Sequence, residues 1–190
     1  MPVKTVTAPA WYPVSLAEAK LYLRETSDTS QDDLISSFVA SATRLFEHET
    51  GITVASQTRE LTLDNFPDAI KLEFPPVQSI GSIKYDDIDG VEQTLSSLDY
   101  KLDNASDKRG WIVPVVGKVW PDTYASAINA VRVRYVAGWV SAAAVPEEIK
   151  LWIKAHVANW HENRSADMPQ QMIRQPALDG IVRRYRIFNL

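Results

Sequence analysis

Three histidines are the side chains of this sequence best suited to bind a metal or to move a proton: His48, His156 and His161. A zinc-protease helix needs a second histidine four residues after the first, but Ile52 follows His48 at that spacing and Ser165 follows His161. His156 and His161 are five residues apart, which places them on different faces of a helix. We therefore expect no metal site, and we interpret these as interfacial and surface histidines.

Nucleotide-binding and nucleophilic motifs are also missing. Gly117 and Lys118 are followed by Val119 rather than by serine or threonine, so they do not form a phosphate-binding loop. The sequence has no Gly-x-Gly-x-x-Gly and no Gly-x-Ser-x-Gly segment, and it contains no cysteine that could act as a nucleophile. The sequence therefore predicts no enzyme activity and no cofactor.

Two groups of residues could bind ligands without catalysis. Asp86, Asp87, Asp89, Gly90 and Glu92 resemble a fragment of a calcium loop, but the glutamate that closes such a loop is missing, and a solvated hairpin turn is favoured. The six tryptophans could line a carbohydrate platform, although rings of this size more often fill a core or a subunit contact. A carbohydrate- or receptor-binding β module is therefore one alternative function. The other is a hydrolase, which would need a cleft that gathers His156 or His161 with carboxylates.

Composition limits the partners. The 190 residues are 45% hydrophobic, which suffices for one compact domain or two small ones, and the net charge of −4 argues against a protein that simply coats nucleic acid. No secretory signal is visible, and no run of about 18 apolar residues could span a membrane. We expect a soluble protein, made in a reducing compartment, with no membrane partner.

Helical patterns open the sequence. Ser15 and Glu18 form a capping box, which predicts a short helix from about Leu16 to Arg24. A second helix is predicted after Ser30 as N-cap, with Gly51 as its left-handed C-cap.

A third, longer helix is predicted from Pro146 to about Arg164, because acidic residues follow the proline and an apolar stripe follows them. The stripe consists of Ile149, Trp152, Ile153, His156, Val157 and Trp160.

Between these helices the period changes from 3.6 to 2. Alternating segments such as Val131, Val133 and Tyr135 predict strands with one wet face, and Asp89-Gly90 predicts a hairpin turn. Residues 54–140 should therefore form about six or seven short antiparallel strands. The predicted fold class is α+β: a helical bundle of two N-terminal helices and a long C-terminal helix, with an inserted antiparallel β region and a C-terminal arm.

The predicted C-terminal arm, residues 165–190, is both basic and apolar. It has four arginines against two aspartates, and twelve of its 26 residues are hydrophobic. Leu178, Ile181, Val182 and Tyr185 share one helical face. The arm could pack on its own domain, dock on a partner or lie on an anionic membrane; we favour the partner.

The order of these segments resembles a known family. The segments that carry the resemblance are Pro13–Lys20, Asp33–Ile35, Glu47–Gly51, Asp64–Pro67, Pro76–Ile80, Tyr85–Asp87 with Asp89-Gly90, Val119–Pro121, Val133–Gly138, Val145–Lys150 and Trp160–Arg164. Together, over about residues 11–165, they resemble the head–tail connector (adaptor) proteins of long-tailed bacteriophages, in the longer subfamily with a β insertion. Gene transfer agents use a related part.

The resemblance implies a non-enzymatic virion protein located in the neck, between head and tail, and assembled in the host cytoplasm. Such proteins form a ring, usually twelve-fold, under the portal protein; they extend the channel for double-stranded DNA and dock stopper or tail-terminator proteins. On this reading, residues 1–53 and 141–164 form the ring domain, residues 54–140 the β region and residues 165–190 the arm.

Two sets of residues are the candidates for these contacts. The candidates for portal binding, at the end of the arm, are Arg183, Arg184, Tyr185, Arg186, Ile187 and Phe188. The candidates for the contact between ring subunits, on the second and third predicted helices, are Phe38, Arg44, Glu47, Trp152, His156 and Trp160. Aromatic residues and arginine are enriched at interfaces, which favours both sets.

Overall fold

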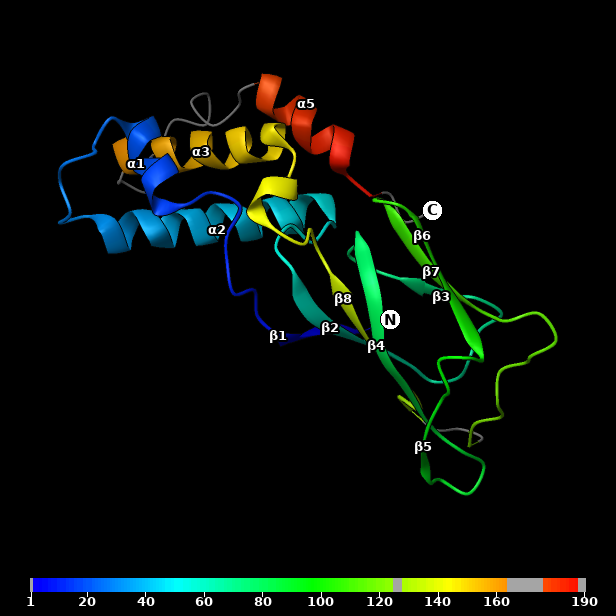
Figure 1. Ribbon diagram of the computed structural model, residues 1–190. Coiled ribbons are helices and arrows are strands. Elements are labelled where there is room, and N and C mark those ends of the chain that lie inside the picture. Colours follow the sequence, from blue (N-terminus) through cyan, green and yellow to red (C-terminus); the bar gives the residue numbers. More distant parts are fainter. Residues whose placement is uncertain (1, 125–127, 164–175, 188–190) are drawn as a thin grey trace. The chain divides into compact units, whose positions relative to one another are not determined.

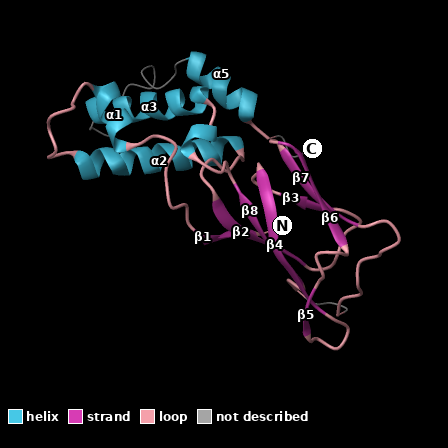
Figure 2. Ribbon diagram, in the orientation of Figure 1, coloured by secondary structure: helices cyan, strands magenta, loops and turns pink. Residues whose placement is uncertain are grey.

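The computed structural model describes residues 2–124, 128–163 and 176–187, and the chain divides into two units. Trp11–Ala55 with Ser141–Leu190 forms one unit, which contains every described helix; Met1–Ala10 with Ser56–Val140 forms the other, which contains every described strand (Figure 2). We call them the helical unit and the strand unit. The predicted α+β fold class is confirmed.

The described part of the helical unit contains four α-helices and one short 3₁₀ helix (Figure 1). They are α1 (Leu16–Leu23), α2 (Asp32–Thr50), the 3₁₀ helix η1 (Ala142–Ala144), α3 (Glu147–Glu162) and α5 (Pro176–Tyr185). The bounds of the first three α-helices agree with the predicted ones to within a few residues.

Local capping explains where α1 and α2 begin and end. The Ser15 hydroxyl accepts the Glu18 amide at 3.2 Å, and the Glu18 carboxylate accepts the Ser15 amide at 2.8 Å, which confirms the capping box. Gly51 ends α2 with φ of 73°, in the predicted left-handed conformation. Ser30 is not the N-cap of α2, because its amide donates to the Asp28 carboxylate at 2.8 Å and the helix starts only at Asp32.

The core of the helical unit lies between α2 and α3. The hydrophobic side chains that α2 and α3 contribute to this core are at most 2% exposed. They are Ile35, Val39, Ala42, Phe46, Ile149, Trp152, Ile153 and Val157. A buried lysine joins α1 to α2: the Lys20 ammonium contacts the Asp32 carboxylate and the Asp28 carbonyl, each at 2.6 Å. These two contacts satisfy a charge that would otherwise be costly to bury.

The strand unit contains two antiparallel sheets. The five-stranded sheet has the order β1-β2-β8-β4-β5 and the three-stranded sheet the order β3-β7-β6. The strands are β1 (Val3–Thr7), β2 (Gln57–Leu63), β3 (Ile70–Leu72), β4 (Val77–Asp86), β5 (Glu92–Thr94), β6 (Tyr100–Ser106), β7 (Arg109–Pro114) and β8 (Val131–Ala137). Seven of the described strands lie between Gln57 and Ala137, in line with the predicted number.

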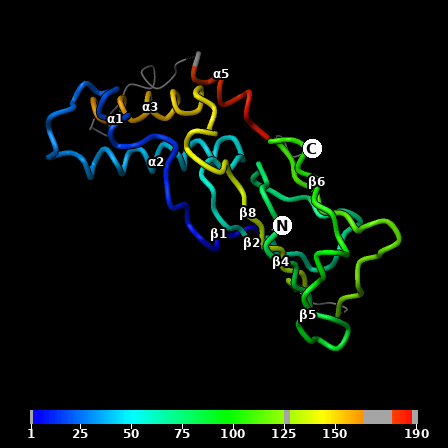
Figure 3. Tube along the Cα trace, viewed as in Figure 1, coloured from blue at the N-terminus to red at the C-terminus, as the bar shows by residue number. Residues whose placement is uncertain are grey.

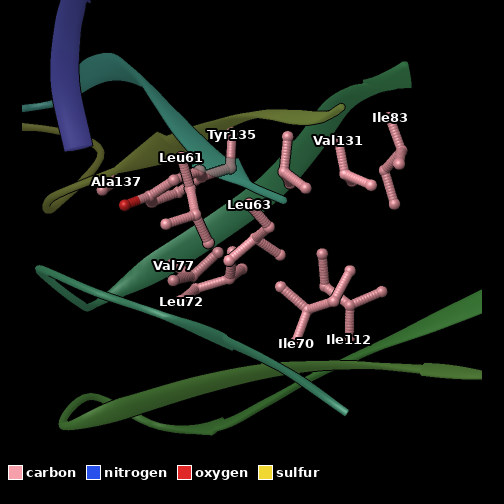
Figure 4. Close-up of a cluster of buried hydrophobic side chains, with 11 residues drawn as sticks. Leu61, Leu63, Ile70, Leu72, Val77, Ile83, Ile112, Val131, Tyr135 and Ala137 are labelled. Atoms are coloured by element: carbon pink, nitrogen blue, oxygen red, sulfur yellow. The ribbon is translucent and has the colours of Figure 1, made fainter. Parts of the chain in front are cut away.

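Alternating side chains give the two sheets a common core. Val131, Val133 and Tyr135 of β8 are fully buried, whereas Arg132 and Arg134 between them point to the other face. Figure 4 shows side chains of β2 and β8 facing Ile70, Leu72 and Ile112 of the smaller sheet. Gly110 on β7 lets the two sheets approach, since a β-carbon there would lie only 2.6 Å from Cγ2 of Val77.

The first strand was not predicted. β1 pairs with β2 in the register Val3 to Leu61, although α1 and α2 lie between them in the sequence (Figure 3). The sequence groups residues 1–53 with the helices, whereas residues 3–7 belong to the strand unit. Four of these five residues are exposed, so no buried alternating face marked the strand.

Candidate functional site

A continuous series of contacts between aromatic side chains runs through the helical unit. It includes four of the candidates for the contact between subunits and one candidate for portal binding. From one end to the other, the contacts are Phe38–Trp160 (6.0 Å between ring centroids), Trp160–His156 (6.0 Å), His156–Trp152 (3.7 Å), Trp152–Phe46 (5.2 Å) and Phe46–Tyr185 (6.1 Å). The rings on α3 follow each other at a spacing of four residues, which places them on one helical face. The series therefore links α2, α3 and α5.

The series has a buried middle and half-buried ends. Phe46 is fully buried and Trp152 is 2% exposed, so both belong to the core of this chain. Phe38, His156, Trp160 and Tyr185 are half-buried. Only these four rings retain surface that another molecule could contact.

The two charged candidates for the contact between ring subunits, Glu47 and Arg44, differ in their surroundings. Glu47 accepts the backbone amide of Val54 at 2.6 Å, so its carboxylate fixes the chain after the Gly51 cap. Arg44 is exposed on α2. Of the six ring-contact candidates, Glu47 and Trp152 are therefore used within the chain, and Phe38, Arg44 and Trp160 lie at its surface.

The described part of the C-terminal arm packs on its own chain. On α5, the Tyr185 hydroxyl donates a hydrogen bond to the Glu148 carboxylate of α3, and the Arg184 guanidinium contacts the same carboxylate at 3.1 Å. Ile187 lies two residues beyond the end of α5, and its amide donates a hydrogen bond to the Thr50 carbonyl at 2.8 Å. Of the three interpretations that the sequence left open, packing of the arm on its own domain is the one that agrees with the structure of residues 176–187.

The remaining candidates of the arm are placed differently. Arg183 and Arg186 are exposed, and the Arg186 amide continues the helical hydrogen bonding to Val182 at 2.9 Å. Tyr185 and Ile187 are half-buried. Phe188, the last candidate, lies outside the described residues. α5 therefore turns apolar groups toward α2 and α3, and arginines toward solvent.

A pocket of about 320 Å³ lies among α2, α3 and α5. Its lining residues are Glu49, Trp152, His156, Leu178, Asp179, Val182 and Arg183. Burial lowers the pKa of His156, an effect only partly offset by the Trp152 carbonyl and by the negative charges of Glu49 and Asp179. Nδ1 of His156 lies 3.0 Å from the Trp152 carbonyl, which favours the tautomer with a proton on Nδ1.

The pocket gathers a histidine and carboxylates but has no hydroxyl or thiol nucleophile. None of its lining residues carries a hydroxyl or thiol group, so a triad of the hydrolase type cannot be built from them. His161 instead contacts Glu25 at 3.3 Å and Gln31 at 3.2 Å, and His48 is exposed on α2. The described residues contain no group of three or more side chains that could hold a metal ion.

The acidic residues that resembled a calcium loop form a turn and an ion-pair network. Arg132 contacts Asp86 at 2.6 Å and Glu92 at 3.0 Å, and the Arg132 guanidinium lowers the pKa of Asp86. The Asp87 carboxylate accepts the amides of Asp89 and Val91, each at 3.0 Å. The carboxylates thus serve the hairpin between β4 and β5, which agrees with the favoured interpretation.

Glu148 is the residue of this site that the sequence did not reveal. Its position in the first turn of α3 was explanation enough for an acidic residue, because negative charge is favoured at the positive end of a helix. The only sequence signal for a second role was the tandem of Arg184 and Tyr185 on an amphipathic segment, and this tandem did not indicate its partner.

Membrane crossing has no support in the described residues, where no helix is both long and apolar enough.

Together, these observations describe an α+β protein whose helical unit carries a series of aromatic side chains with half-buried ends. No protein-family model matches the chain, and no curated protein matches it.

Solved structures with the same fold do exist. A chain in the neck of an empty GTA particle, computed with C6 symmetry, matches with a TM-score of 0.83 and 21% identity, over 100% of this chain and 97% of that one. A chain in the virion of the native gene transfer agent (GTA) particle matches with a TM-score of 0.81 and 20% identity, at the same coverage. A chain in the neck of the native GTA particle, computed with C12 symmetry, gives 0.76 and 19%, again with 100% and 97% covered. At these identities the likeness establishes a shared fold along the entire chain.

Proposed function

We propose that this protein is a structural head-to-tail adaptor of a long-tailed phage or of a phage-like particle such as a gene transfer agent. The observation that carries the proposal is the shared fold, over 97% or more of both chains, with proteins from the neck of GTA particles. The adaptor forms a ring under the portal, extends the DNA channel and docks the stopper or tail. It acts in the virion neck, after assembly in the host cytoplasm, and catalyses no reaction.

The proposed ring has twelve copies, each of which contacts its neighbour through two different surfaces. Such a heterologous contact closes into a ring when the rotation between copies closes. One of the neck structures with the same fold was computed with C12 symmetry, which supports this number. The surface positions for the contact are Phe38, Arg44 and Trp160, with α2 and α3 as parts of the ring-forming helical bundle.

The strand unit provides the proposed tail-side surface. An ordered turn in the loop after β7 exposes Val116 completely and Val119 by 86%. The turn is fixed by the Lys118 amide, which donates to the Val115 carbonyl at 2.9 Å, and by the ion pair of Lys118 with Asp99 at 2.8 Å. Apolar side chains held in solvent in this way are typical of protein contacts, here with a stopper or tail-terminator protein.

Portal binding is assigned to the C-terminal segment. In the free chain its exposed cations are Arg183 and Arg184 of α5 and Arg186 just after it, and Arg184 is engaged with Glu148. The proposed contacts pair these cations with carboxylates of the portal, and Tyr185, Ile187 and Phe188 supply the apolar part. DNA passes through the ring with only weak contacts, and we expect no strong affinity for duplex DNA at physiological salt.

The alternative function, a carbohydrate- or receptor-binding β module, gains no support from the tryptophans. All six lie in the described part of the chain and none of them is exposed. Trp120, for instance, stacks on Phe66 with ring centroids 5.0 Å apart, and its indole donates to the Asp68 carbonyl at 3.3 Å. Trp152 is buried in the core and the other five tryptophans are half-buried, so none of these rings is presented as an exposed platform.

The test is a binding measurement with the portal protein of the same particle. Native mass measurement of the mixture should give a joint ring-sized complex, and the double substitution Arg183→Glu with Arg186→Glu should weaken it at least about tenfold, because two cations become anions at the contact. Lys101→Glu on β6, which also reverses an exposed cation, is the matched control and should leave binding intact. Absence of any joint complex with the unmodified chain would refute the adaptor function.

A further inference from the structure

α5 is held to the rest of the helical unit by a loose interface. Its apolar side chains Leu178, Ile181, Val182 and Tyr185 are only half-buried, although together they form the inner face of the helix. The side chains of α2 and α3 beneath it, such as Phe46 and Trp152, are buried. Segments with few buried contacts open at a lower free energy than the core to which they are attached.

The pocket beneath α5 adds to this looseness. Leu178 and Val182 line it together with Glu49 and Asp179, so these apolar side chains face a polar space instead of a dry core. A void between two packed elements removes the dispersion contacts that would hold them together. Within the described part of α5 and the two residues after it, the polar contacts with α2 and α3 lie at the C-terminal end.

The attachment at that end depends on a few groups. Tyr185 and Arg184 both donate to the Glu148 carboxylate, and the Ile187 amide donates to the Thr50 carbonyl. The Arg184 side chain is 69% exposed, and an ion pair so exposed contributes little. A competing surface that offers a carboxylate beside an apolar groove would reproduce the side-chain contacts of Arg184 and Tyr185 with Glu148.

We propose that α5 is a releasable clasp, which holds Tyr185 and Ile187 on the α2–α3 surface of the free chain and leaves that surface when the C-terminal segment binds its partner. This inference rests on the proposed function, in which these side chains contact the portal. The two binding modes exclude each other, because the same atoms of Tyr185 and Ile187 cannot face both surfaces. The free chain thus keeps its apolar contact residues covered until a partner with the same chemistry as Glu148 and Phe46 takes α5.

The position of Gly51 allows α5 to be locked in place. A β-carbon added at Gly51 would lie 3.7 Å from Cβ of Ile187, and disulfides join β-carbons about 3.5–4.5 Å apart. The chain contains no cysteine, so Gly51→Cys combined with Ile187→Cys introduces the one possible disulfide. Gly51 has φ of 73°, which strains any side chain there, and Gly51→Cys alone is therefore the matched control.

The locked and unlocked forms of this double variant should differ in binding to the portal. Because Ile187→Cys shortens a portal-contact side chain, we expect the reduced form to bind more weakly than the unmodified chain. The oxidised form should bind at least about tenfold more weakly than the reduced form, a difference that a reductant removes. Equal binding by both forms would overturn the clasp while leaving the adaptor function in place. Disulfides formed between copies rather than within one chain would also overturn it, because α5 would then lie on a neighbour.

A second measurement decides the proposal without a portal. Hydrogen exchange of the isolated chain should show the Arg186 and Ile187 amides opening at least about a hundredfold more readily than the amides around Phe46. Gly180→Ala, at an exposed position with no atom within 4 Å of the added carbon, should slow exchange in α5 by about fivefold through helix propensity alone. Equal protection of α5 and α2 would refute the clasp. Failure of every form to bind portal would instead refute the adaptor function.

Discussion

The hydroxyl of Tyr185, in the last turn of α5, donates a hydrogen bond to the carboxylate of Glu148, in the first turn of α3. The two residues are 37 positions apart in the sequence, so this hydrogen bond attaches the C-terminal helix to the beginning of α3. Because Arg184 contacts the same carboxylate, this glutamate is the main polar anchor of α5.

Glu148→Gln should loosen α5 without unfolding the protein. The amide keeps an acceptor for Tyr185 but loses the charge that strengthens its hydrogen bond and attracts Arg184, a loss of about 1 kcal/mol. Hydrogen exchange of the α5 amides should accelerate about fivefold, with the global free energy of unfolding nearly unchanged. Glu162→Gln, at the exposed end of α3, is the control, and an equal effect of both substitutions would contradict the role of Glu148.

Phe46→Ala should be the most destabilising truncation in the series of aromatic side chains that links α2, α3 and α5. Phe46 is fully buried and contacts both Trp152 and Tyr185, so its removal leaves a cavity and should lower the free energy of unfolding by about 3–5 kcal/mol. Phe38→Ala removes the same atoms at a half-buried end of the series, and we expect a loss smaller by at least about 1 kcal/mol. Denaturant titration measures both, and similar losses would show that Phe38 is as much a core residue as Phe46.

Acidification should destabilise the helical unit through His156. Burial holds its pKa below the value of about 6.5 expected in the unfolded chain, although Glu49 and Asp179 oppose the shift and Arg183 also lines the pocket. The neutral imidazole therefore contributes stability that is complete above the unfolded pKa and is lost as the pH falls through the folded pKa.

The measurement is the free energy of unfolding at about pH 7.5 and about pH 5, on either side of that value. His156→Asn should reduce the difference between the two conditions, because an asparagine does not titrate there. His48→Asn, at an exposed position, controls for the loss of an imidazole. An unchanged pH dependence in His156→Asn would contradict the assignment.

Gly110→Ala should push the two sheets of the strand unit apart. The added carbon would lie 2.6 Å from Cγ2 and 3.1 Å from Cβ of Val77, which is closer than real contacts allow. Overpacking of this kind costs about 1–3 kcal/mol. Adding Val77→Ala should recover part of the loss, in a double-mutant cycle that isolates the contact. Gly81→Ala is the control, because its nearest neighbour is 3.4 Å away.

Features that depend on neighbouring residues could be predicted from the sequence. The Ser15–Glu18 capping box, the left-handed Gly51 and the alternation around Val133 all follow from side chains within one turn or one strand. The turn at Gly90, with φ of 77°, belongs to the same class. Such features are decided locally, because steric and hydrogen-bonding preferences act over a few residues.

The surface that each apolar stripe covers could not be predicted. Trp152 and Trp160 belong to the same predicted stripe of α3, yet Trp152 is buried in the core and Trp160 keeps exposed area at its edge. The hydrophobic pattern of α5 likewise indicated that the segment needs a partner, but not that α2 and α3 supply one. Periodicity reports which face of a helix is buried and carries no information on what buries it.

The sequence by itself therefore determined the α+β class, the first three helices, a region of about six or seven strands between residues 54 and 140, and the basic, apolar character of the chain end. Only the tertiary structure decided that β1 pairs with β2, that Glu47 and Trp152 serve their own chain, and that α5 folds back onto Glu148. These contacts join residues far apart in sequence, and their energies depend on how whole elements pack, which no local pattern encodes.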